Sequence, residues 1–594
     1  MLLYTTPSRK QRLHKSAVGG AASLCNHLAI PEAERYDAQD RQPRRTNINR
    51  QSARIGLVLA LLLACAPARA AELIVFTRGV MNDIGPNDRP KPAERVKSVS
   101  LYALRGEYEP FTFAVHNDGG APLLLTARSA PLYPRRADRL RPIPASCVEV
   151  RGLKRGAKFR WRRTGDWVLD RAGEASTGPG ANARFWATVH VPPNAAPGDY
   201  DGKVTIAAGD QSAVLKIVLH VAKAELRDVP GVKFYLLGTV SPYGQYHRWV
   251  KPAQEKALRP KVVAFYRELK QHGMTGICIK TSDFPYREGK IPGLIAEAEA
   301  AKEAGLTGPI VWNMLALIDA AKGGDRYDFN GRMDNWDEKK DLARLRVLHA
   351  LATAEAKKRG WPEIIYCPID EPGTQYENRS FLLRSMDILL KTTRELKKLG
   401  VRCHSTISEP VDDKHNRAPR WSKTPDEMRK LWDKCRPTLS VRNYGYGYPQ
   451  GKTDFHHEMR DAKKRGHEVW TYYNAAVMGR DRRCARICFG LWGWRAKLDA
   501  VTAWTYPGGR TVQFEMVREG IDDHKAIAVL ESLIKNRKGN EADRRAAQKF
   551  LHDLGAAIQL DKNGFISNWP ACAKAVRLDT LKQRLITHID KLAD

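Results

Sequence analysis

The first part of the chain is built from short apolar or alternating runs. Gly, Pro, Asn and Asp separate these runs, and helical periodicity is weak as far as about residue 225. Strand-sized runs with frequent turn residues predict a β-sandwich over residues 72–225. The clearest runs are 73–77, 110–116, 123–127, 147–151, 187–191, 202–207 and 213–221.

After residue 226 the pattern changes, because apolar strand-like runs now alternate with amphipathic helical stretches. Alternation of strand and helix implies parallel strands, and eight such units predict a (β/α)₈ barrel over residues 230–525. Helical spacing continues through residues 526–594, which predicts a helical C-terminal segment packed on the barrel. The eight strand runs are 232–237, 276–280, 309–313, 364–369, 401–406, 439–442, 468–473 and 500–506.

A basic, then apolar, then small-residue pattern lies near the N-terminus. Arg50 and Arg54 precede the apolar run 55–64, and small residues follow as far as Ala70. This order is typical of a signal peptide, and the run is short for a membrane span. We therefore expect export to the periplasm or the extracellular space, and we exclude residues 1–70 from the fold. A membrane anchor or a buried helix is the alternative.

Two processing sites compete within this segment. Ala68-Arg69-Ala70 gives a cleavage site with a mature start near Ala71, whereas Leu62-Leu63-Ala64-Cys65 is similar to a lipoprotein signal that would attach a lipid to Cys65. A signal segment seldom begins so late, so we expect translation to start after Met1.

Composition adds a strong positive charge. The hydrophobic fraction of 43% is typical of a globular protein, and a length of 594 residues indicates more than one domain. The formal charge is +33, of which +7 lies in the first 70 residues. Such a charge attracts polyanions, including sulfated or uronate-rich glycans. A basic proteome explains it equally well. The sequence carries no nucleic-acid-binding signature, so we expect no nucleic-acid partner.

Cysteine and histidine spacing argues against a metal centre. Eight cysteines lie beyond residue 70 without a CxxC pair, and His-x-x-x-His and mixed Cys/His clusters are missing from the sequence. We expect lone buried thiols, no bound metal and no cofactor. The pattern does not specify an oligomeric state.

The strongest chemical signal is an adjacent pair of carboxylates. Asp370 and Glu371 directly follow the apolar run 364–369, and Pro372 comes next. In barrel enzymes the chemistry lies at the carboxyl ends of the strands. Neighbouring carboxylates repel each other, which raises at least one pKa and suits a general acid. A helix cap or solvated turn is the alternative interpretation.

Polar and aromatic residues follow the other predicted strands. One such residue would more often belong to the core, but a cluster at one face of a barrel favours contact with a sugar, because aromatic faces stack on sugar rings and amide or phenol groups bond to hydroxyls. The candidate substrate-binding residues are Asn313, Glu409, Asn443, Tyr444, Tyr446, Trp470, Tyr472, Asn474, Trp504 and Tyr506.

The expected second carboxylate of a retaining glycosidase is missing. Such enzymes place two carboxyl groups about 5 Å apart across the sugar, and in many barrel glycosidases the nucleophile follows strand seven. Here strand seven ends with Tyr472, Tyr473 and Asn474, and no acid precedes Asp481. A substrate's own 2-acetamido group can replace that nucleophile. This mechanism needs one acid/base and one carboxylate that orients the acetamido nitrogen. An Asp-Glu pair supplies both groups.

Three motifs resemble glycoside hydrolase family 123 and its relatives in the domain of unknown function 4091. They are the strand Leu104-Arg105-Gly106-Glu107-Tyr108-Glu109-Pro110, the Asp370-Glu371-Pro372 turn, and Arg518-Glu519-Gly520-Ile521-Asp522-Asp523 in the last barrel segment. The resemblance covers about residues 72–530. It implies a β-N-acetylgalactosaminidase that acts by substrate assistance, with Glu371 as acid/base and Asp370 orienting the acetamido group. The family's final "DYE" is here Asp523-His524-Lys525.

Three other functions stay open at this point. A two-carboxylate glycosidase on another glycan would use Glu371 as acid and Glu409 as the second carboxylate. A non-catalytic glycan-binding or envelope protein could use a decayed barrel, although the intact Asp-Glu pair argues against it. A polyanion-binding protein would rest on charge alone, and its binding would depend strongly on salt.

Overall fold

The computed structural model describes most of the chain after the signal-like segment, and the described residues all belong to one unit that begins at Arg69. The expected signal peptide and Cys65 lie outside the described residues. The described residues are 73–135, 141–155, 167–238, 241–243, 252–280, 291–314, 336–370, 372, 379–407, 425–445, 455–479, 481–504, 510–561, 564–566 and 568–593.

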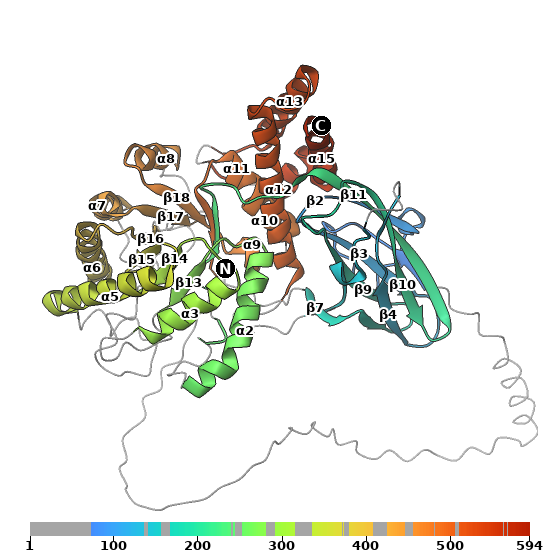
Figure 1. Cartoon of the computed structure of the whole chain (residues 1–594), viewed down its shortest axis with the longest axis horizontal. Helices are drawn as coiled ribbons and strands as arrows, with labels where there is room; N and C mark the ends of the chain where they lie inside the picture. The colour runs from blue at the N-terminus through green and yellow to red at the C-terminus, as the bar shows by residue number, and fades with distance from the viewer. Residues whose placement is uncertain are drawn as a thin grey trace, which may run out of the picture. The chain divides into compact units, whose positions relative to one another are not determined.

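Two sheets that share one apolar core form the first part of this unit (Figure 1). One sheet has the order β1-β3-β9-β6-β7, and the other has the order β2-β11-β10-β4-β8, with β5 paired to β10. The strands are β1 (Leu73–Phe76), β2 (Ser98–Arg105), β3 (Tyr108–Asn117), β4 (Leu123–Ser129), β5 (Tyr133–Pro134), β6 (Val148–Arg155), β7 (Trp167–Ala172), β8 (Glu174–Thr177), β9 (Asn182–His190), β10 (Gly198–Ala208) and β11 (Gln211–Glu225).

Stacked aromatic rings mark the centre of the sandwich. Phe113 of β3 and Phe185 of β9 face each other with ring centroids 4.9 Å apart, and both side chains are fully buried. Val204 and Leu215 from the other sheet complete the same cluster. Alternate residues of each strand therefore point inward, which is the pattern expected when two sheets bury one face each.

The first family-like motif is a tight turn that joins the two sheets, and not the single strand that the sequence suggested. β2 ends at Arg105 and β3 begins at Tyr108, with Gly106 at φ +85° between them. Only glycine adopts this conformation without strain, so the chain can reverse there in two residues. β2 pairs in parallel with the distant β11, whereas the other ladders described in the two sheets are antiparallel.

The second part alternates parallel strands with helices, as the sequence predicts. Each of the eight predicted runs overlaps one strand, although β16 and β17 extend beyond the predicted ends. The strands are β12 (Lys233–Leu236), β13 (Ile277–Lys280), β14 (Ile310–Asn313), β15 (Ile364–Cys367), β16 (His404–Ile407), β17 (Val441–Gly445), β18 (Glu468–Tyr472) and β19 (Ala500–Ala503). The longer helices between them are α2 (Pro252–Gln271), α3 (Pro292–Glu303), α5 (Glu338–Arg359), α6 (Arg379–Lys398), α7 (Pro425–Cys435) and α8 (Phe455–Lys464).

The eight strands form two parallel sheets that meet at their edges. One sheet has the order β12-β19-β18-β17-β16, so the last strand pairs with the first, and the other has the order β13-β14-β15. A parallel bridge between Tyr366 and Cys403 links β15 to β16. The Thr275 N–H donates to the Phe234 carbonyl at 3.1 Å and links the approach to β13 with β12. Adjacent strands therefore run in chain order with their carboxyl ends on one side.

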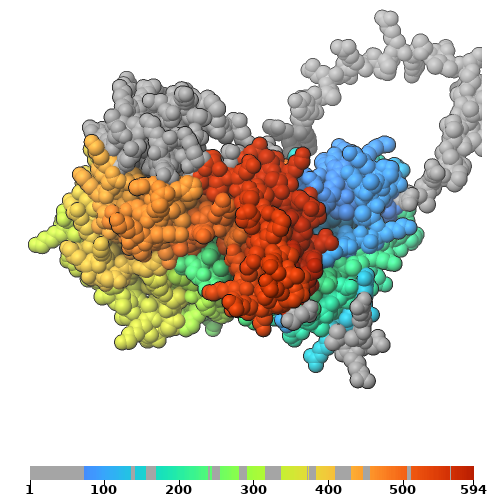
Figure 2. Space-filling view, turned by 90° about the horizontal axis from the view of Figure 1, so that it is seen from above, coloured from blue at the N-terminus to red at the C-terminus, as the bar shows by residue number. Residues whose placement is uncertain are grey.

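One helix crosses the expected boundary between barrel and C-terminal segment. α12 (Val512–Lys535) begins with Thr511, whose side chain accepts from the Phe514 N–H, and it continues without a break past residue 525. The third family-like motif therefore lies in the buried first half of this helix. The helices that follow are α13 (Glu541–Ala557), α14 (Trp569–Ala575) and α15 (Leu581–Leu592), and they form the red surface in Figure 2.

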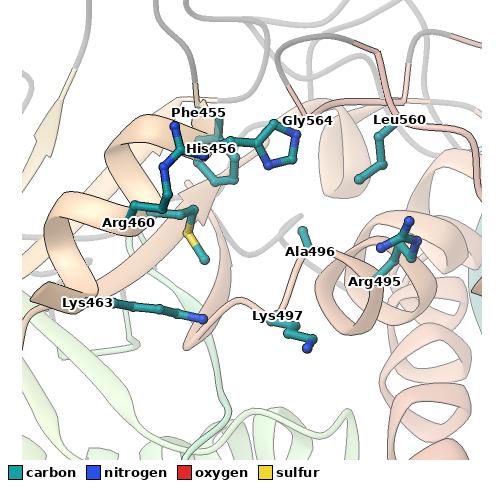
Figure 3. Close-up of a pocket in the computed structure, with 10 residues that line it drawn as sticks. Phe455, His456, Arg460, Lys463, Arg495, Ala496, Lys497, Leu560 and Gly564 are labelled. Carbon is teal, nitrogen blue, oxygen red and sulfur yellow. The ribbon is translucent and has the colours of Figure 1, made fainter.

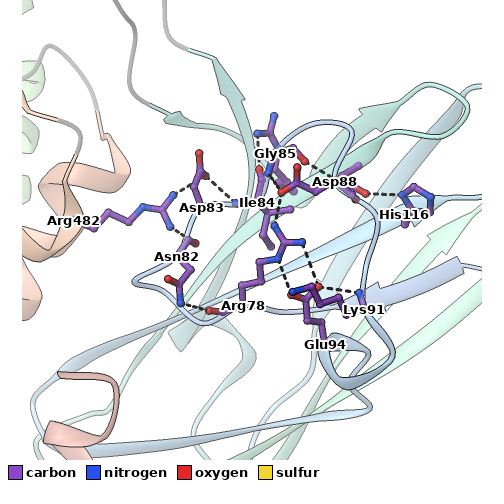
Figure 4. A network of polar contacts seen from close by, with 12 residues as sticks. Arg78, Asn82, Asp83, Ile84, Gly85, Asp88, Lys91, Glu94, His116 and Arg482 are labelled. Carbon is purple, nitrogen blue, oxygen red and sulfur yellow. Dashed lines mark hydrogen bonds and ion pairs between the residues drawn. The ribbon is translucent and has the colours of Figure 1, made fainter. Parts of the chain in front are cut away.

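Polar contacts join the sandwich to the helices of the second part. Arg482, at the start of α10 (Arg482–Ile487), donates to the carbonyls of Val80 and Asn82 at 3.0 and 2.7 Å and pairs with Asp83 at 3.1 Å (Figure 4). In α15, Asp590 contacts His220 of β11 at 2.7 Å. These contacts position the two parts within one unit.

The described residues include no helix long and apolar enough to cross a bilayer. None of the eight described cysteines forms a disulfide, and seven of them are buried. A search of the same residues finds no group of three or more His, Cys, Asp or Glu side chains that could hold a metal ion.

Candidate functional site

The strand register divides the interior of the α/β part into layers. In parallel pairing, Trp470 lies beside Asn443 and Ala500, and Tyr472 lies beside Gly445 and Thr502. Residues that are neighbours in a parallel ladder point to the same face. Glu468, Trp470 and Tyr472 therefore point inward at successive levels, from the amino end of β18 to its carboxyl end.

The layer at the amino ends is held by ion pairs. Glu468 accepts from Lys233 at 2.9 Å and from Arg402 at 2.8 Å, and Arg402 also pairs with Glu363 at 3.2 Å. The Trp470 indole N–H donates to the other Glu468 oxygen at 2.8 Å. Lys233, Glu468, Arg402 and Glu363 therefore form a chain of ion pairs at the amino ends of the strands.

Aromatic rings fill the next layer. Trp470 has no exposed surface, and its ring stacks on Tyr235 at 5.1 Å and lies 5.3 Å from the His404 ring. Both Trp470 and Tyr235 belong to a small interior cluster that is separate from the larger core beneath the helices. Trp470 was predicted to contact a sugar, but the structure places it one layer below the strand ends, in the core.

Small polar side chains form the layer at the carboxyl ends. The Asn443 amide donates to the Thr406 hydroxyl at 3.1 Å and accepts from the Thr502 hydroxyl at 3.5 Å. Asn313, the last residue of β14, and Tyr472, the last of β18, are also inward and nearly buried. Asn313 and Tyr472 therefore end their strands, whereas Asn443 lies two residues before the end of β17, in register with Trp470.

Asn474 and Trp504 extend this edge. The Asn474 side chain accepts from the Trp504 N–H at 2.9 Å, and Trp504 is 39% exposed, a high value for a tryptophan. Gly238, just after β12, lies directly against the Trp504 ring, because a Cβ at this position would come within 2.2 Å of it. The glycine thus lets an exposed indole rest across the end of β12.

Tyr444 does not join the site. It is 4% exposed and belongs to the core beneath the helices, where its hydroxyl contacts Glu458 of α8 and its ring meets Phe455 edge to face at 5.8 Å. Successive strand residues alternate between faces, so an inward Asn443 requires an outward Tyr444. The predicted contact of Tyr444 with substrate is therefore corrected to a contact with α8.

Asp370 is the described half of the carboxylate pair. It follows β15 by three residues and is half-buried, and the Ser405 hydroxyl holds the preceding carbonyl of Ile369 at 2.9 Å. Its Oδ1 atom is buried and has no hydrogen-bond partner among the described residues. Glu371, Glu409, Tyr446 and Tyr506 lie outside the described residues.

His404 is a site residue that the sequence analysis missed. It is 1% exposed and points inward from β16, and neither ring nitrogen has a hydrogen-bond partner among the described residues. Burial lowers the pKa of His404 to about 4, against the opposite effect of the nearby Asp370 carboxylate. The ring is therefore neutral near pH 7 and carries one donor and one acceptor. The polar residues Arg402, His404 and Thr406 stand at alternate positions in the sequence. This alternation was the signal that could have identified His404.

The other two family-like motifs meet at the junction between sandwich and helices. Glu107, in the turn between β2 and β3, is fully buried, accepts from the Leu104 N–H at 2.7 Å and pairs with Lys582 of α15. In α12, Asp523 pairs with Arg486 through two contacts of 2.7 and 3.0 Å. These charges lie away from the strand ends and are matched by opposite charges, which indicates a structural role.

Comparison with known proteins supports the fold. No protein-family model and no curated protein sequence matches the chain. A family 123 glycoside hydrolase from Clostridium perfringens, described for the hydrolysis of glycolipid glycans, is similar in structure with a TM-score of 0.54 at 12% identity, over 84% of this chain and 94% of that one.

Two further structures overlap less well. A putative α-galactosidase from Bacteroides fragilis has a TM-score of 0.26 at 12% identity, over 73% of this chain and 78% of that one. A sugar phosphate isomerase/epimerase from Parabacteroides distasonis has a TM-score of 0.29 at 15% identity, over 51% and 98%. Both scores are too low to support an argument.

The similarity to the Clostridium perfringens enzyme shows that this chain has the fold of a family 123 glycoside hydrolase, as the three sequence motifs predict.

Proposed function

We propose that the eight parallel strands form one (β/α)₈ barrel and that the chain is an exported glycoside hydrolase with its centre at Asp370 and Glu371. The observation that carries this proposal is the buried Oδ1 of Asp370, which has no described partner and lies at the carboxyl end of a strand. Buried polar atoms are nearly always hydrogen-bonded, so one left unpaired at such an edge is suited to a ligand. The family 123 fold supports a glycan as that ligand.

The reaction we propose is the cleavage of a β-linked N-acetylhexosamine, most readily N-acetylgalactosamine, with retention. Glu371 donates a proton to the leaving oxygen while the 2-acetamido oxygen attacks the anomeric carbon. Asp370 accepts from the acetamido N–H and stabilises the positive oxazolinium-like intermediate. Glu371 then removes a proton from the water that opens this intermediate. No second carboxylate is needed, in agreement with Tyr472 and Asn474 at the end of β18.

The first experiment measures release of p-nitrophenol from its β-N-acetylgalactosaminide by the full-length chain. We expect Glu371→Gln to lower turnover by at least about a hundredfold, as for loss of a general acid. Glu363→Gln is the matched control, since Glu363 lies just before the other end of β15 and pairs with Arg402. Turnover that survives Glu371→Gln would remove this residue from the mechanism.

A second pair of substrates tests assistance by the acetamido group. The p-nitrophenyl β-galactoside has a 2-hydroxyl in place of the 2-acetamido group, so the proposed mechanism leaves it intact. Hydrolysis of both substrates at similar rates would contradict substrate assistance and would favour a two-carboxylate mechanism through Glu409. Hydrolysis of neither would contradict an exo-acting N-acetylhexosaminidase.

A further inference from the structure

A basic pocket lies beside α8, on the helix side of the α/β part. It encloses about 260 Å³, and Phe455, Met459 and Leu560 give it an apolar wall. Figure 3 shows the α8 residues on one side and the segment Arg495–Lys497 on the other. Its charged lining consists of Arg460, Lys463, Arg495 and Lys497, with the imidazole of His456 beside them, and the described lining contains no acid.

The acids of α8 do not neutralise this pocket, because they point the other way. Glu458 and Asp461 contact the buried Arg442 of β17 at 3.4 and 2.7 Å. Arg460 and Lys463 lie three residues apart and line the pocket together. The helix therefore places its negative charges against the sheet and its positive charges around the pocket.

On the opposite wall, the backbone conformation determines where the basic residues lie. Lys497 follows α11 (Gly493–Arg495) in a left-handed conformation with φ 53°, where glycine is the usual residue after a helix end. Its N–H donates to the Trp494 carbonyl at 3.1 Å. Arg495 donates through Nε to the Gly555 carbonyl at 2.9 Å. Basic residues from two separate elements thus line one space.

We propose that this pocket binds a sulfate or carboxylate group of an anionic glycan chain, with the sugar ring against the apolar wall. Cations around one space favour anions through Coulomb attraction and charge-assisted hydrogen bonds. The pocket is separate from the strand ends described above, since Lys463 and Lys497 precede the amino ends of β18 and β19. The choice of a glycan rests on the proposed function, whereas the affinity for an anion rests on the pocket alone.

The test is calorimetric binding of a sulfated galactan tetrasaccharide to the full-length chain. This probe contains no N-acetylhexosamine, so the proposed hydrolysis leaves it intact and binding is measured without turnover. We expect binding of the sulfated form and not of its desulfated counterpart. The pocket variant Lys463→Gln/Lys497→Gly should weaken binding roughly tenfold, because two charge contacts are lost. Glycine at position 497 suits the left-handed backbone, so the fold is preserved.

The control variant is Lys535→Gln/Arg537→Gly. Lys535 is also a last-turn lysine, of α12, and Arg537 has the same φ of 53° just beyond that helix end. The two variants therefore lose equal charge at equivalent backbone positions, and the control should change affinity by less than about twofold.

Three outcomes would overturn the proposal. The first is no binding of the sulfated probe, and the second is an equal loss in both variants, which would assign binding to net charge. In the third, a short single-stranded DNA binds more tightly than the sulfated galactan and loses affinity in the pocket variant, which would make the occupant a phosphodiester. Failure of the proposed hydrolysis would appear instead as no turnover of the p-nitrophenyl substrates, with this binding unchanged.

Discussion

Two buried polar regions of this protein differ in how their groups are paired. At the junction of sandwich and helices, Glu107 faces Lys582 and Asp523 faces Arg486, whereas Glu109 Oε2 and Glu519 Oε1 have no hydrogen-bond partner among the described residues. At the strand ends, Asp370 Oδ1 and both nitrogens of His404 have no described partner. Paired charges hold segments together, whereas unpaired polar atoms leave hydrogen-bonding capacity for a ligand. The ion pairs at the junction and the position of Asp370 after a strand end, and not burial itself, thus distinguish the structural region from the candidate site.

The largest expected effect comes from breaking the junction. Lys582→Met leaves the fully buried Glu107 without its cation, and an uncompensated buried charge costs about 3–5 kcal/mol. The free energy of unfolding from urea denaturation measures this loss. Lys549→Met is the control, because Lys549 is exposed and pairs with Asp553 at 2.9 Å. It should cost less than about 1 kcal/mol. Equal effects of the two variants would contradict the comparison.

The reverse is expected at the strand ends. Asp370→Asn should lower turnover of the acetamido substrate roughly a hundredfold, by analogy with the loss of one electrostatic contact to a transition state. The free energy of unfolding should stay within about 0.5 kcal/mol, since Oδ1 has no described partner to lose. A strongly destabilised variant would instead assign Asp370 to the structural class.

The junction also predicts a dependence of stability on pH. Burial raises the pKa of Glu519 to about 8 and that of Asp522 to about 7. A carboxyl group whose pKa rises on folding gives its full contribution to stability below its unfolded pKa, and loses it as the pH rises through its folded value. The melting temperature should therefore fall by several degrees from about pH 6 to about pH 9.

Glu519→Gln sharpens this prediction, because a neutral amide cannot lose the proton. Its melting temperature should decline less steeply with pH than that of the unchanged chain. Parallel curves for both proteins above pH 6 would contradict the role of Glu519.

At acid pH the effect of Glu515 on stability has the opposite sign. Burial alone would raise the pKa of Glu515, but Arg518, His272 and Arg510 hold that pKa well below its usual range. The contribution of Glu515 to stability is therefore lost as the pH falls.

The smallest expected effect is at His404. His404→Phe removes two buried nitrogens that lack described partners, so the free energy of unfolding should rise by about 1 kcal/mol. Turnover should fall by roughly tenfold if the neutral ring supports Asp370. Thermal melting and initial rates measure the two effects. A stable variant with unchanged turnover would leave His404 as a core residue beside Trp470.

The strand pattern was predictable from the sequence because it depends on local runs. Each of the eight apolar runs after residue 226 overlaps a strand, and Asn313 and Tyr472 are the last residues of their strands. Alternation along one strand would also have excluded Tyr444, once Asn443 was taken to point inward.

Contacts between distant segments were not predictable in the same way. No local pattern indicates that β2 pairs in parallel with β11, or that Lys582 of the last helix reaches Glu107. His404 was missed because its surroundings, and not its neighbours in sequence, leave both nitrogens unpaired. The position of Trp470 relative to the carboxyl ends of the strands likewise depends on the register between strands, which cannot be predicted from the local sequence.

The pairing of Glu107 with Lys582 has a consequence for the order of folding during synthesis. A chain emerges from the ribosome with its N-terminal part first, so the turn between β2 and β3 that carries Glu107 is made long before α15. Before α15 is made, Lys582 is missing from the junction. Glu107 then lacks its cation, and Asp523 has only Arg486 beside it. Burying a carboxylate without its cation is unfavourable, so the two halves should dock only after the last helix has been made.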